Sequence, residues 1–209
     1  MAKDIAELIR RLRKEHPGAK YELDWSTPLE LLVATILAAQ ATDEGINRLT
    51  PSLFAKYKKP EDYLRVPVEE LEQDIKPSGF FRNKAKAIRG ACQGLIENFG
   101  GEVPRTLDEL ITLPGVARKT ANVVLNTGFD IPSGIIVDTH VARVSQRMGL
   151  SAETKPDEIE KDLMRDVPVD QWTFFGPAMV LHGRYTCTAK KPKCDECPLA
   201  DLCDKKGVA

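Results

Sequence analysis

The sequence LPGVARKTA, at residues 113–121, joins two segments whose apolar residues recur at helical spacing. Pro114 and Gly115 are expected to end the first helix, and a second helix should cover residues 119–126. Gly115 permits backbone angles and close approaches that a side chain would block. The pattern predicts a helical hairpin whose second helix offers free N–H groups to an anion such as a phosphate. A plain αα-hairpin with a glycine turn has the same pattern, so this stretch alone assigns no function.

Helical patterns continue on both sides of the hairpin. Capping boxes at residues 27–30 (TPLE) and 106–109 (TLDE) mark two helix starts. The first opens a helix to about Ala39 that has almost no polar face and should be central. Further helices are expected at residues 5–14, 44–57, 68–75, 85–96, 139–148, 157–165 and 170–182. The single β-rich run, residues 135–137, is too short for a sheet, so the predicted fold class is all-α. The Gly- and Pro-containing stretch 130–134 is the best candidate for a crossing between domains.

Two residues near the hairpin are candidates for chemistry. Lys119 lies in the first turn of its helix, where the macrodipole disfavours a cation. Together with partial burial, this would leave some uncharged amine to act as a nucleophile. The alternative is a phosphate-binding or merely solvated lysine. Asp138 precedes another helix and is first of all an N-cap, but a capping carboxylate is held rigidly and can also serve a reaction.

Four of the five cysteines lie near the end of the chain, with the spacing Cys187-x6-Cys194-x2-Cys197-x5-Cys203. In a reducing compartment, clustered thiols of this kind are more often metal ligands than disulfides. A structural zinc and an iron–sulfur cubane both remain open, because the spacing fits neither the usual zinc ribbons nor the ferredoxin runs. The fifth cysteine, Cys92, lies among apolar residues at helical spacing and should be a buried, inert thiol.

Composition limits the partners that the chain can attract. The 209 residues carry a net charge of −1, so nucleic acid would have to bind a local basic patch. The first candidate patch lies between the first two cysteines of the tail and comprises Lys190, Lys191 and Lys193, with Arg184 just before it. The second is the basic stretch from Arg82 to Arg89. The N-terminus lacks an apolar signal core and no apolar run approaches membrane-spanning length, so we expect a cytoplasmic protein with no membrane partner.

Taken together, the motifs resemble a known family. The hairpin with its lysine is accompanied by AAQATD at residues 38–43, VDTH at 137–140, LHGRYTC at 181–187 and the cysteine tail. This combination, in this order over nearly the whole chain, resembles the endonuclease III family, which consists of bifunctional DNA glycosylases of the helix-hairpin-helix superfamily.

The resemblance implies a fold, a cofactor and a substrate. It implies a six-helix barrel domain at residues 21–131 that carries the hairpin, and a second helical domain at residues 1–20 plus 132–209. A DNA cleft would lie between the two domains. It also implies a [4Fe–4S] cluster in place of zinc. The activity would be base excision repair in which a monomer, in the bacterial nucleoid, removes oxidised pyrimidines such as thymine glycol from duplex DNA. The same enzyme would cleave abasic sites by β-elimination.

The resemblance also implies roles for individual residues. Lys119 would attack C1′ of a flipped nucleotide to form a Schiff base, and Asp138 would stabilise positive charge on the sugar. Gln40 would fill the gap left by the flipped base, and Phe80 or Phe81 would wedge against the opposite strand. DNA phosphates would be bound by the hairpin and by basic residues of the tail, namely Gly115, Val116, Ala117, Arg118, Arg184, Lys190, Lys191 and Lys193.

Two departures from the family pattern and three rival functions accompany this interpretation. Ala117 stands where the family usually has a second glycine, and the near-neutral charge is unusual for such an enzyme. The first rival is a monofunctional adenine glycosylase that activates water, although Lys119 argues against it. The second is a DNA-binding or redox-sensing module without enzymatic activity, and the third is a zinc-stapled helical domain.

Overall fold

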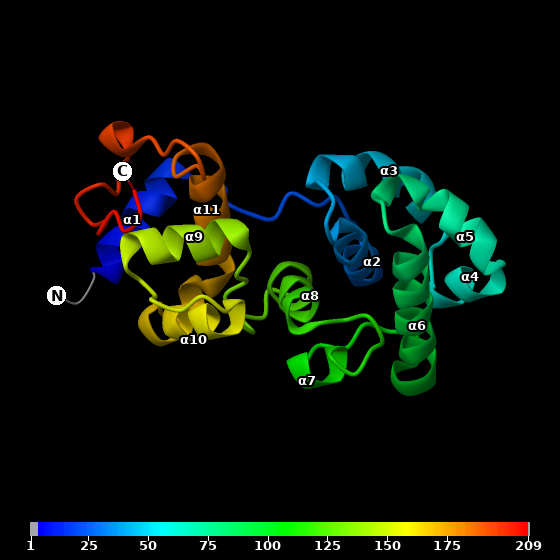
Figure 1. Ribbon diagram of the computed structural model, residues 1–209. Helices are drawn as coiled ribbons and strands as arrows, with labels where there is room; N and C mark the ends of the chain where they lie inside the picture. Colours follow the sequence, from blue (N-terminus) through cyan, green and yellow to red (C-terminus); the bar gives the residue numbers. More distant parts are fainter. Residues whose placement is uncertain (1–3, 209) are drawn as a thin grey trace. The chain divides into compact units, whose positions relative to one another are not determined.

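The structure is a computed structural model that describes residues 4–208, and every regular element in this part of the chain is helical (Figure 1). The α-helices are α1 (Ile5–Glu15), α2 (Pro28–Ala38), α3 (Asp43–Lys56), α4 (Pro60–Arg65), α5 (Val68–Asp74), α6 (Phe81–Phe99), α7 (Leu107–Leu110), α8 (Arg118–Val123), α9 (Thr139–Met148), α10 (Pro156–Asp166) and α11 (Trp172–Tyr185). The prediction of an all-α fold is confirmed. Within residues 4–208, no helix is long and apolar enough to cross a membrane.

The chain divides into two compact units. One consists of Glu22–Ile131, and the other combines Met1–Tyr21 with Pro132–Ala209. The chain passes between them twice, between Tyr21 and Glu22 and again between Ile131 and Pro132, and the second crossing lies inside the Gly- and Pro-containing stretch at residues 130–134. Residues 135–137, which carry the β-rich run, are buried and form neither helix nor strand.

The unit Glu22–Ile131 is built around α2, as the apolar pattern predicted. The Thr27 hydroxyl caps this helix by accepting a hydrogen bond from the Glu30 amide, and Pro28 occupies its first position. Its apolar residues are almost fully buried, and α2 contacts α3, α6 and α8. Helix α4 was missing from the predicted helices. It has only six residues, and its buried Pro60 and Tyr63 are too few to produce a helical period.

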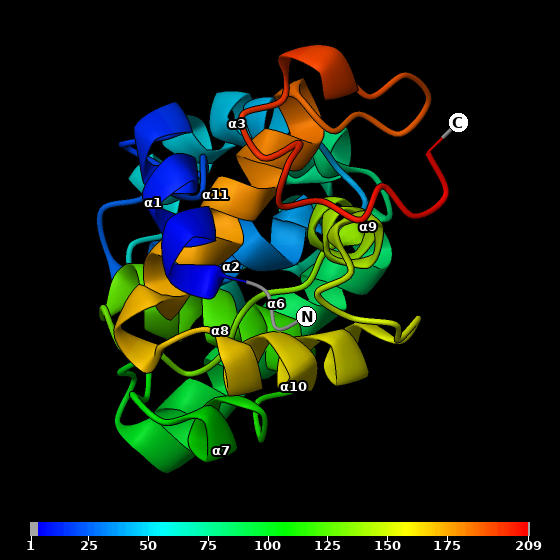
Figure 2. The same cartoon turned by 90° about the vertical axis from the view of Figure 1, so that its left-hand side faces the viewer.

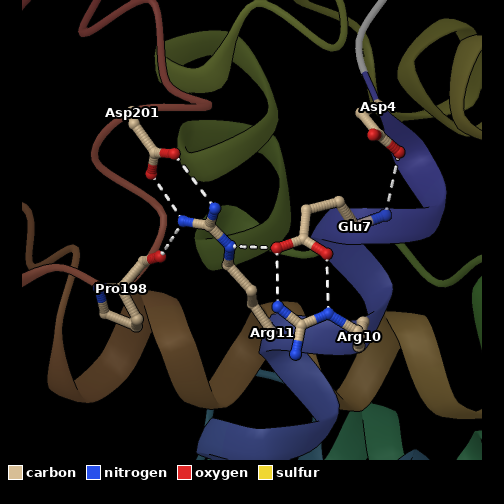
Figure 3. A network of polar contacts seen from close by, with 6 residues as sticks. All are labelled: Asp4, Glu7, Arg10, Arg11, Pro198 and Asp201. Atoms are coloured by element: carbon tan, nitrogen blue, oxygen red, sulfur yellow. Dashed lines mark hydrogen bonds and ion pairs between the residues drawn. The ribbon is translucent and has the colours of Figure 1, made fainter.

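The other unit packs α1 against α11 and α11 against α9, and Figures 1 and 2 both show α1 beside α11. Apolar side chains of α1, α9, α10 and α11 form one core. Helix α1 also holds the C-terminal tail, because the Arg11 guanidinium donates to the Asp201 carboxylate (2.5 Å) and to the Pro198 carbonyl (2.8 Å). Figure 3 shows that Glu7 supports Arg11 from the preceding turn of α1 (2.7 Å).

Candidate functional site

The hairpin of residues 113–121 connects α7 to α8. The Thr106 hydroxyl caps α7 by accepting a hydrogen bond from the Glu109 amide. Gly115 has a φ of +80°, and a Cβ atom at this position would lie 2.5 Å from the Cβ of Ala87 in α6. The turn therefore needs glycine at position 115 for two reasons, its backbone conformation and its close packing on α6.

Helix α6 makes room for this turn with two glycines of its own. A Cβ atom on Gly90 would lie 2.8 Å from Pro114, and one on Gly94 would lie 2.8 Å from Leu113. Both glycines stand inside a helix, where glycine lowers stability by about 1 kcal/mol relative to alanine. Their four-residue spacing places them on one face of α6. This spacing is the sequence signal that could have identified the surface of α6 on which the hairpin packs.

Lys119 is the second residue of α8, and its side chain is exposed. The expected partial burial is therefore wrong, because α8 buries Ala121, Asn122 and Val123 and turns Lys119 to solvent. Val116 also differs from expectation. Its side chain is buried and its N–H donates to the Leu113 carbonyl (3.1 Å), so neither group is available to a phosphate and Val116 shapes the turn.

Asp138 is the N-cap of α9, as its position predicted. Its Oδ1 atom accepts hydrogen bonds from the amides of His140 and Val141, both at 2.8 Å. Within residues 4–208, Oδ2 makes no hydrogen bond. One oxygen thus fixes the half-buried carboxylate while the other can face developing positive charge.

The four cysteines of the tail line one cavity of about 390 Å³, part of it open to solvent. None of the four forms a disulfide in the described part of the chain, which argues against the disulfide alternative. Hydrogen-bond donors surround the sulfur atoms, since Arg147 Nη1 lies 3.4 Å from Cys187 Sγ and the Lys205 amide lies 3.3 Å from Cys203 Sγ. Convergent thiols with donors directed at sulfur fit an iron–sulfur cluster, whose ligands are thiolates stabilised by such hydrogen bonds.

A third donor reaches the cysteines from a histidine whose role the sequence pattern did not predict. His182, 2% exposed, places Nε2 3.7 Å from Cys197 Sγ and Nδ1 2.8 Å from Oε2 of Glu15. The Thr186 hydroxyl donates to the other oxygen of Glu15 (2.7 Å). Burial lowers the pKa of His182, but hydrogen bonds to Cys197 and Glu15 outweigh it and raise the pKa to about 9. For Glu15, burial raises the pKa, yet the bonds from His182 and Thr186 leave it below its ordinary value.

Two arginines of α9 hold the loop between Cys187 and Cys194. Arg147 donates to the carbonyls of Thr188 (2.7 Å) and Ala189 (2.9 Å), and Arg143 donates to the Cys187 carbonyl (3.2 Å). The loop is closed at its base by the Lys193 amide, which donates to the Thr186 carbonyl. Lys190, Lys191 and Lys193 are exposed on this braced backbone, whereas Arg184 is half-buried. The four-residue spacing of the arginines was their signal in the sequence, because it places both on one face of α9.

The model of HhH-GPD superfamily base excision DNA repair proteins matches residues 33–168. The chain belongs to the HhH-GPD superfamily. The model for the iron-sulfur binding domain of endonuclease III matches residues 187–203. This match supports the [4Fe–4S] cluster that the resemblance implied in place of zinc, and the four cysteines are its candidate ligands.

Individual relatives are similar in sequence to this chain over nearly its full length. Endonuclease III of Synechocystis sp. is 52% identical over 94% of this chain and 90% of the relative. Endonuclease III of Bacillus subtilis is 50% identical over 99% and 97%. The solved structure of a trapped endonuclease III–DNA covalent intermediate is 47% identical and superposes with a TM-score of 0.91, covering 96% of this chain and 94% of that one.

Two further positions singled out by the resemblance to this superfamily have unusual backbones. Gln40 is exposed at φ +57°, and Phe80 is 65% exposed at φ +47°. A non-glycine residue in the left-handed region costs roughly 1–3 kcal/mol, so both loops store strain at their tips. Phe81 is the first residue of α6 and is half-buried beneath the Arg82 guanidinium. Of the two phenylalanines, Phe80 is thus the one presented to solvent.

The second basic stretch, from Arg82 to Arg89, differs from its predicted role. Arg89 donates to the carbonyls of Tyr63 and Val66, both at 2.8 Å, and Lys84 is 5% exposed. Only Arg82 and Lys86 of the four cations are exposed, and their i, i+4 spacing places them on one outer face of α6. This stretch does not form a continuous basic surface.

Proposed function

We propose that this protein is a base excision repair enzyme that removes oxidised pyrimidines, such as thymine glycol, from duplex DNA and then cleaves the abasic site. Membership in a superfamily of base excision DNA repair proteins supports the excision step. The full-length likeness to proteins named endonuclease III supports the bifunctional activity. The covalent DNA intermediate reported for a 47% identical chain supports a mechanism through a bond between protein and DNA.

The observation that carries the proposal is the exposed amine of Lys119, placed in the first turn of α8 directly after the hairpin. Its Nζ atom would attack C1′ of the flipped nucleotide while the glycosidic bond breaks and the base leaves with the bonding electrons and a proton. Opening of the sugar would give an imine. Loss of a C2′ proton would then expel the 3′ phosphate, and water would hydrolyse the imine to restore the amine.

Asp138 would support these steps electrostatically. The attack at C1′ builds positive charge on the sugar, and a carboxylate stabilises that charge most effectively when it is already held in place. The two amide hydrogen bonds to Oδ1 supply this rigidity, and Oδ2 has no competing partner in residues 4–208. The same carboxylate could accept the proton that the amine releases.

DNA contacts would come from several segments. Gln40 and Phe80 would enter the duplex, and we assign the wedge to Phe80 because it is the exposed phenylalanine. Phosphates would bind at the hairpin and the braced loop, through Gly115, Ala117, Arg118, Arg184, Lys190, Lys191 and Lys193. We further propose that the units Glu22–Ile131 and Met1–Tyr21 plus Pro132–Ala209 are the barrel and cluster domains, and that the protein acts as a monomer in the cytoplasm.

The [4Fe–4S] cluster supplies structural cross-linking of the tail, because four thiolates fill its coordination. The proposal is tested by incubating the holoprotein with duplexes that carry thymine glycol, an abasic site or 8-oxoguanine, with and without borohydride. We expect incision at the first two lesions and covalent capture that depends on borohydride. Incision without capture would indicate activated water in place of an amine, and equal binding of damaged and intact duplex without incision would indicate a DNA-binding module.

A further inference from the structure

A buried lysine connects the two loops that carry Gln40 and Phe80. The ammonium of Lys84 donates to the Leu37 carbonyl (2.7 Å) and to the Ser78 carbonyl (2.6 Å). Lys84 is 5% exposed and has no ion pair within residues 4–208, and its burial lowers its pKa. Burying a cation without a counter-charge is unfavourable, so this lysine lowers the stability of the fold except for what its two hydrogen bonds return.

The first carbonyl belongs to the segment that leads to Gln40. Leu37 stands in the last turn of α2, where the final carbonyls have no partner inside the helix. The chain leaves α2 through Ala38 and Ala39, and Gln40 follows in the left-handed region. A cation at this end of α2 satisfies a free carbonyl and is favoured by the helix dipole.

The second carbonyl belongs to the segment that leads to Phe80. Ser78 ends the short helix η1 (Lys76–Ser78), Gly79 follows at φ +69°, and Phe80 is left-handed at φ +47°. Ser78 and Leu37 are 41 positions apart in the sequence, yet their oxygens meet at one nitrogen. Each strained residue thus lies two or three positions beyond a carbonyl that Lys84 holds.

We propose that Lys84 is a positioning residue that fixes the Gln40 and Phe80 loops in the conformations that enter the DNA duplex, an inference that rests on the function proposed above. An ammonium carries three N–H groups in a tetrahedral arrangement, so one atom can bind carbonyls from two segments and set the distance between them. A side chain of equal length without donors would leave both carbonyls buried and unpaired, and each loop could then relax its strain independently.

The direct test is hydrogen exchange of the free holoprotein, comparing Lys84→Met with the wild type. The Ala41 amide donates to the Ala38 carbonyl and the Gly79 amide donates to the Lys76 carbonyl, so these amides report on the two loops. We expect both to exchange at least about tenfold faster in the variant. The loss of a hydrogen bond to a charged donor should raise the population of the open state of each loop by more than a factor of ten. Lys58→Met, which alters an exposed lysine of the same unit, should leave both rates unchanged. Faster exchange at one loop alone, or at neither, would overturn the proposal.

A second measurement connects the loops to DNA. Single-stranded DNA with an abasic site needs the Lys119 chemistry but no insertion into a duplex. We expect Lys84→Met to lower kcat/KM on the abasic duplex by about tenfold or more, since small misplacements have effects of this size. Its kcat/KM on the single strand should stay near the wild-type value. Equal losses on both substrates would show a general structural role and contradict the proposal.

The two proposals can fail separately. A wild-type protein that cuts neither substrate would refute the proposed function, whereas the exchange experiment would still test the bridge because it uses no DNA. Should Lys84→Met fail to fold, Lys84→Gln replaces it. The glutamine side chain ends one bond short of the lysine nitrogen and should reach neither carbonyl, so the same paired increase in exchange is expected.

Discussion

Asp138 and Arg147 lie at opposite ends of the same helix, α9. Asp138 caps its first turn through two amide hydrogen bonds, and Arg147 in its last turn binds two carbonyls of the loop after Cys187. Arg143, one turn earlier, binds the same loop. A single ten-residue helix therefore carries the candidate catalytic carboxylate and braces the cluster loop. The helix whose first turn is capped by Asp138 is therefore tied to the cluster loop by side chains further along it.

Replacement of Lys119 by glutamine should abolish borohydride trapping and leave DNA binding within a few-fold of the wild type. The amide has no nucleophilic amine, but the lost charge is only one of many positive charges in the protein. Trapping can be followed on denaturing gels, and binding by fluorescence anisotropy on an intact duplex.

Lys119→Arg is the matched control for this change. The guanidinium keeps the charge but stays protonated, so binding should return to the wild-type value while trapping remains absent. Trapping that survives in either variant would identify another amine as the nucleophile.

Replacement of Asp138 by asparagine should separate its two roles. Asparagine is a good N-cap, so the free energy of unfolding should fall by about 1 kcal/mol or less. Base excision should fall strongly, because a neutral amide gives no electrostatic stabilisation to the sugar cation. Thermal melts and single-turnover excision of thymine glycol measure the two effects. Excision at the wild-type rate in Asp138→Asn would reduce this residue to a cap, and Asp138→Ala should lose both stability and excision.

Replacement of Glu15 by glutamine should weaken retention of the cluster. The Glu15 carboxylate accepts from Nδ1 of His182, which orients Nε2 toward Cys197 Sγ. Outer partners of metal ligands typically change affinity by roughly 10- to 100-fold, so we expect cluster loss to a chelator to accelerate by about tenfold or more. The visible absorbance of the brown protein follows this loss without any measurement of activity.

The exposed Glu69 of α5 provides a control of equal charge change, and Glu69→Gln should lose its cluster at the wild-type rate. Unchanged cluster loss in Glu15→Gln would show that the bond from His182 to the Cys197 thiolate does not depend on Glu15.

The sequence predicted the features that depend on local pattern. The central position of α2, the caps at Thr27, Thr106 and Asp138, and the glycine of the hairpin all follow from spacing and turn chemistry. It failed where long-range packing decides the outcome. Lys84 resembles a surface cation within a basic stretch, yet it is buried because two carbonyls distant in sequence converge on it.

The same limit applies to the surroundings of the cluster. The cysteine spacing predicted a metal centre, but nothing local connects Glu15 to His182, which are 167 positions apart. Conversely, the expectation of partial burial for Lys119 is wrong. Its exposure depends on which face of α8 packs against the unit, and the short helix has too few residues to show that face in the sequence.

Two stacked tyrosines offer a test of polar satisfaction in the unit Glu22–Ile131. The rings of Tyr57 and Tyr63 lie 4.8 Å apart, but only Tyr57 has a partner for its hydroxyl, which donates to Asp74 Oδ2 (2.7 Å). The Tyr63 hydroxyl is buried and unpaired within the part of the chain that the structure describes. Tyr63→Phe should therefore raise the free energy of unfolding by about 1 kcal/mol, and Tyr57→Phe should lower it by a similar amount.

Thermal melts of the holoprotein would register each change as a shift of about 2–4 °C, in opposite directions. Each variant serves as the control for the other, because each removes one phenolic oxygen from one of two neighbouring rings. A loss of stability in Tyr63→Phe would mean that its hydroxyl has a partner, such as a water molecule.

Removal of the three exposed lysines of the braced loop should weaken DNA binding without affecting the fold. Arg147, Arg143 and the Lys193 amide hold the loop through backbone atoms, so Lys190→Ala, Lys191→Ala and Lys193→Ala together should leave the protein folded and brown. Damaged and intact duplex should be bound less tightly by similar factors, because phosphate contacts carry no sequence information. The plot of log K against log salt concentration should become shallower by about 0.9 for each lost contact.

The corresponding triple arginine variant, which keeps the charge on the same backbone, should preserve the wild-type slope. An unchanged slope in the triple alanine variant would show that the loop does not touch DNA, and Arg82 and Lys86 would then be the next exposed cations to replace.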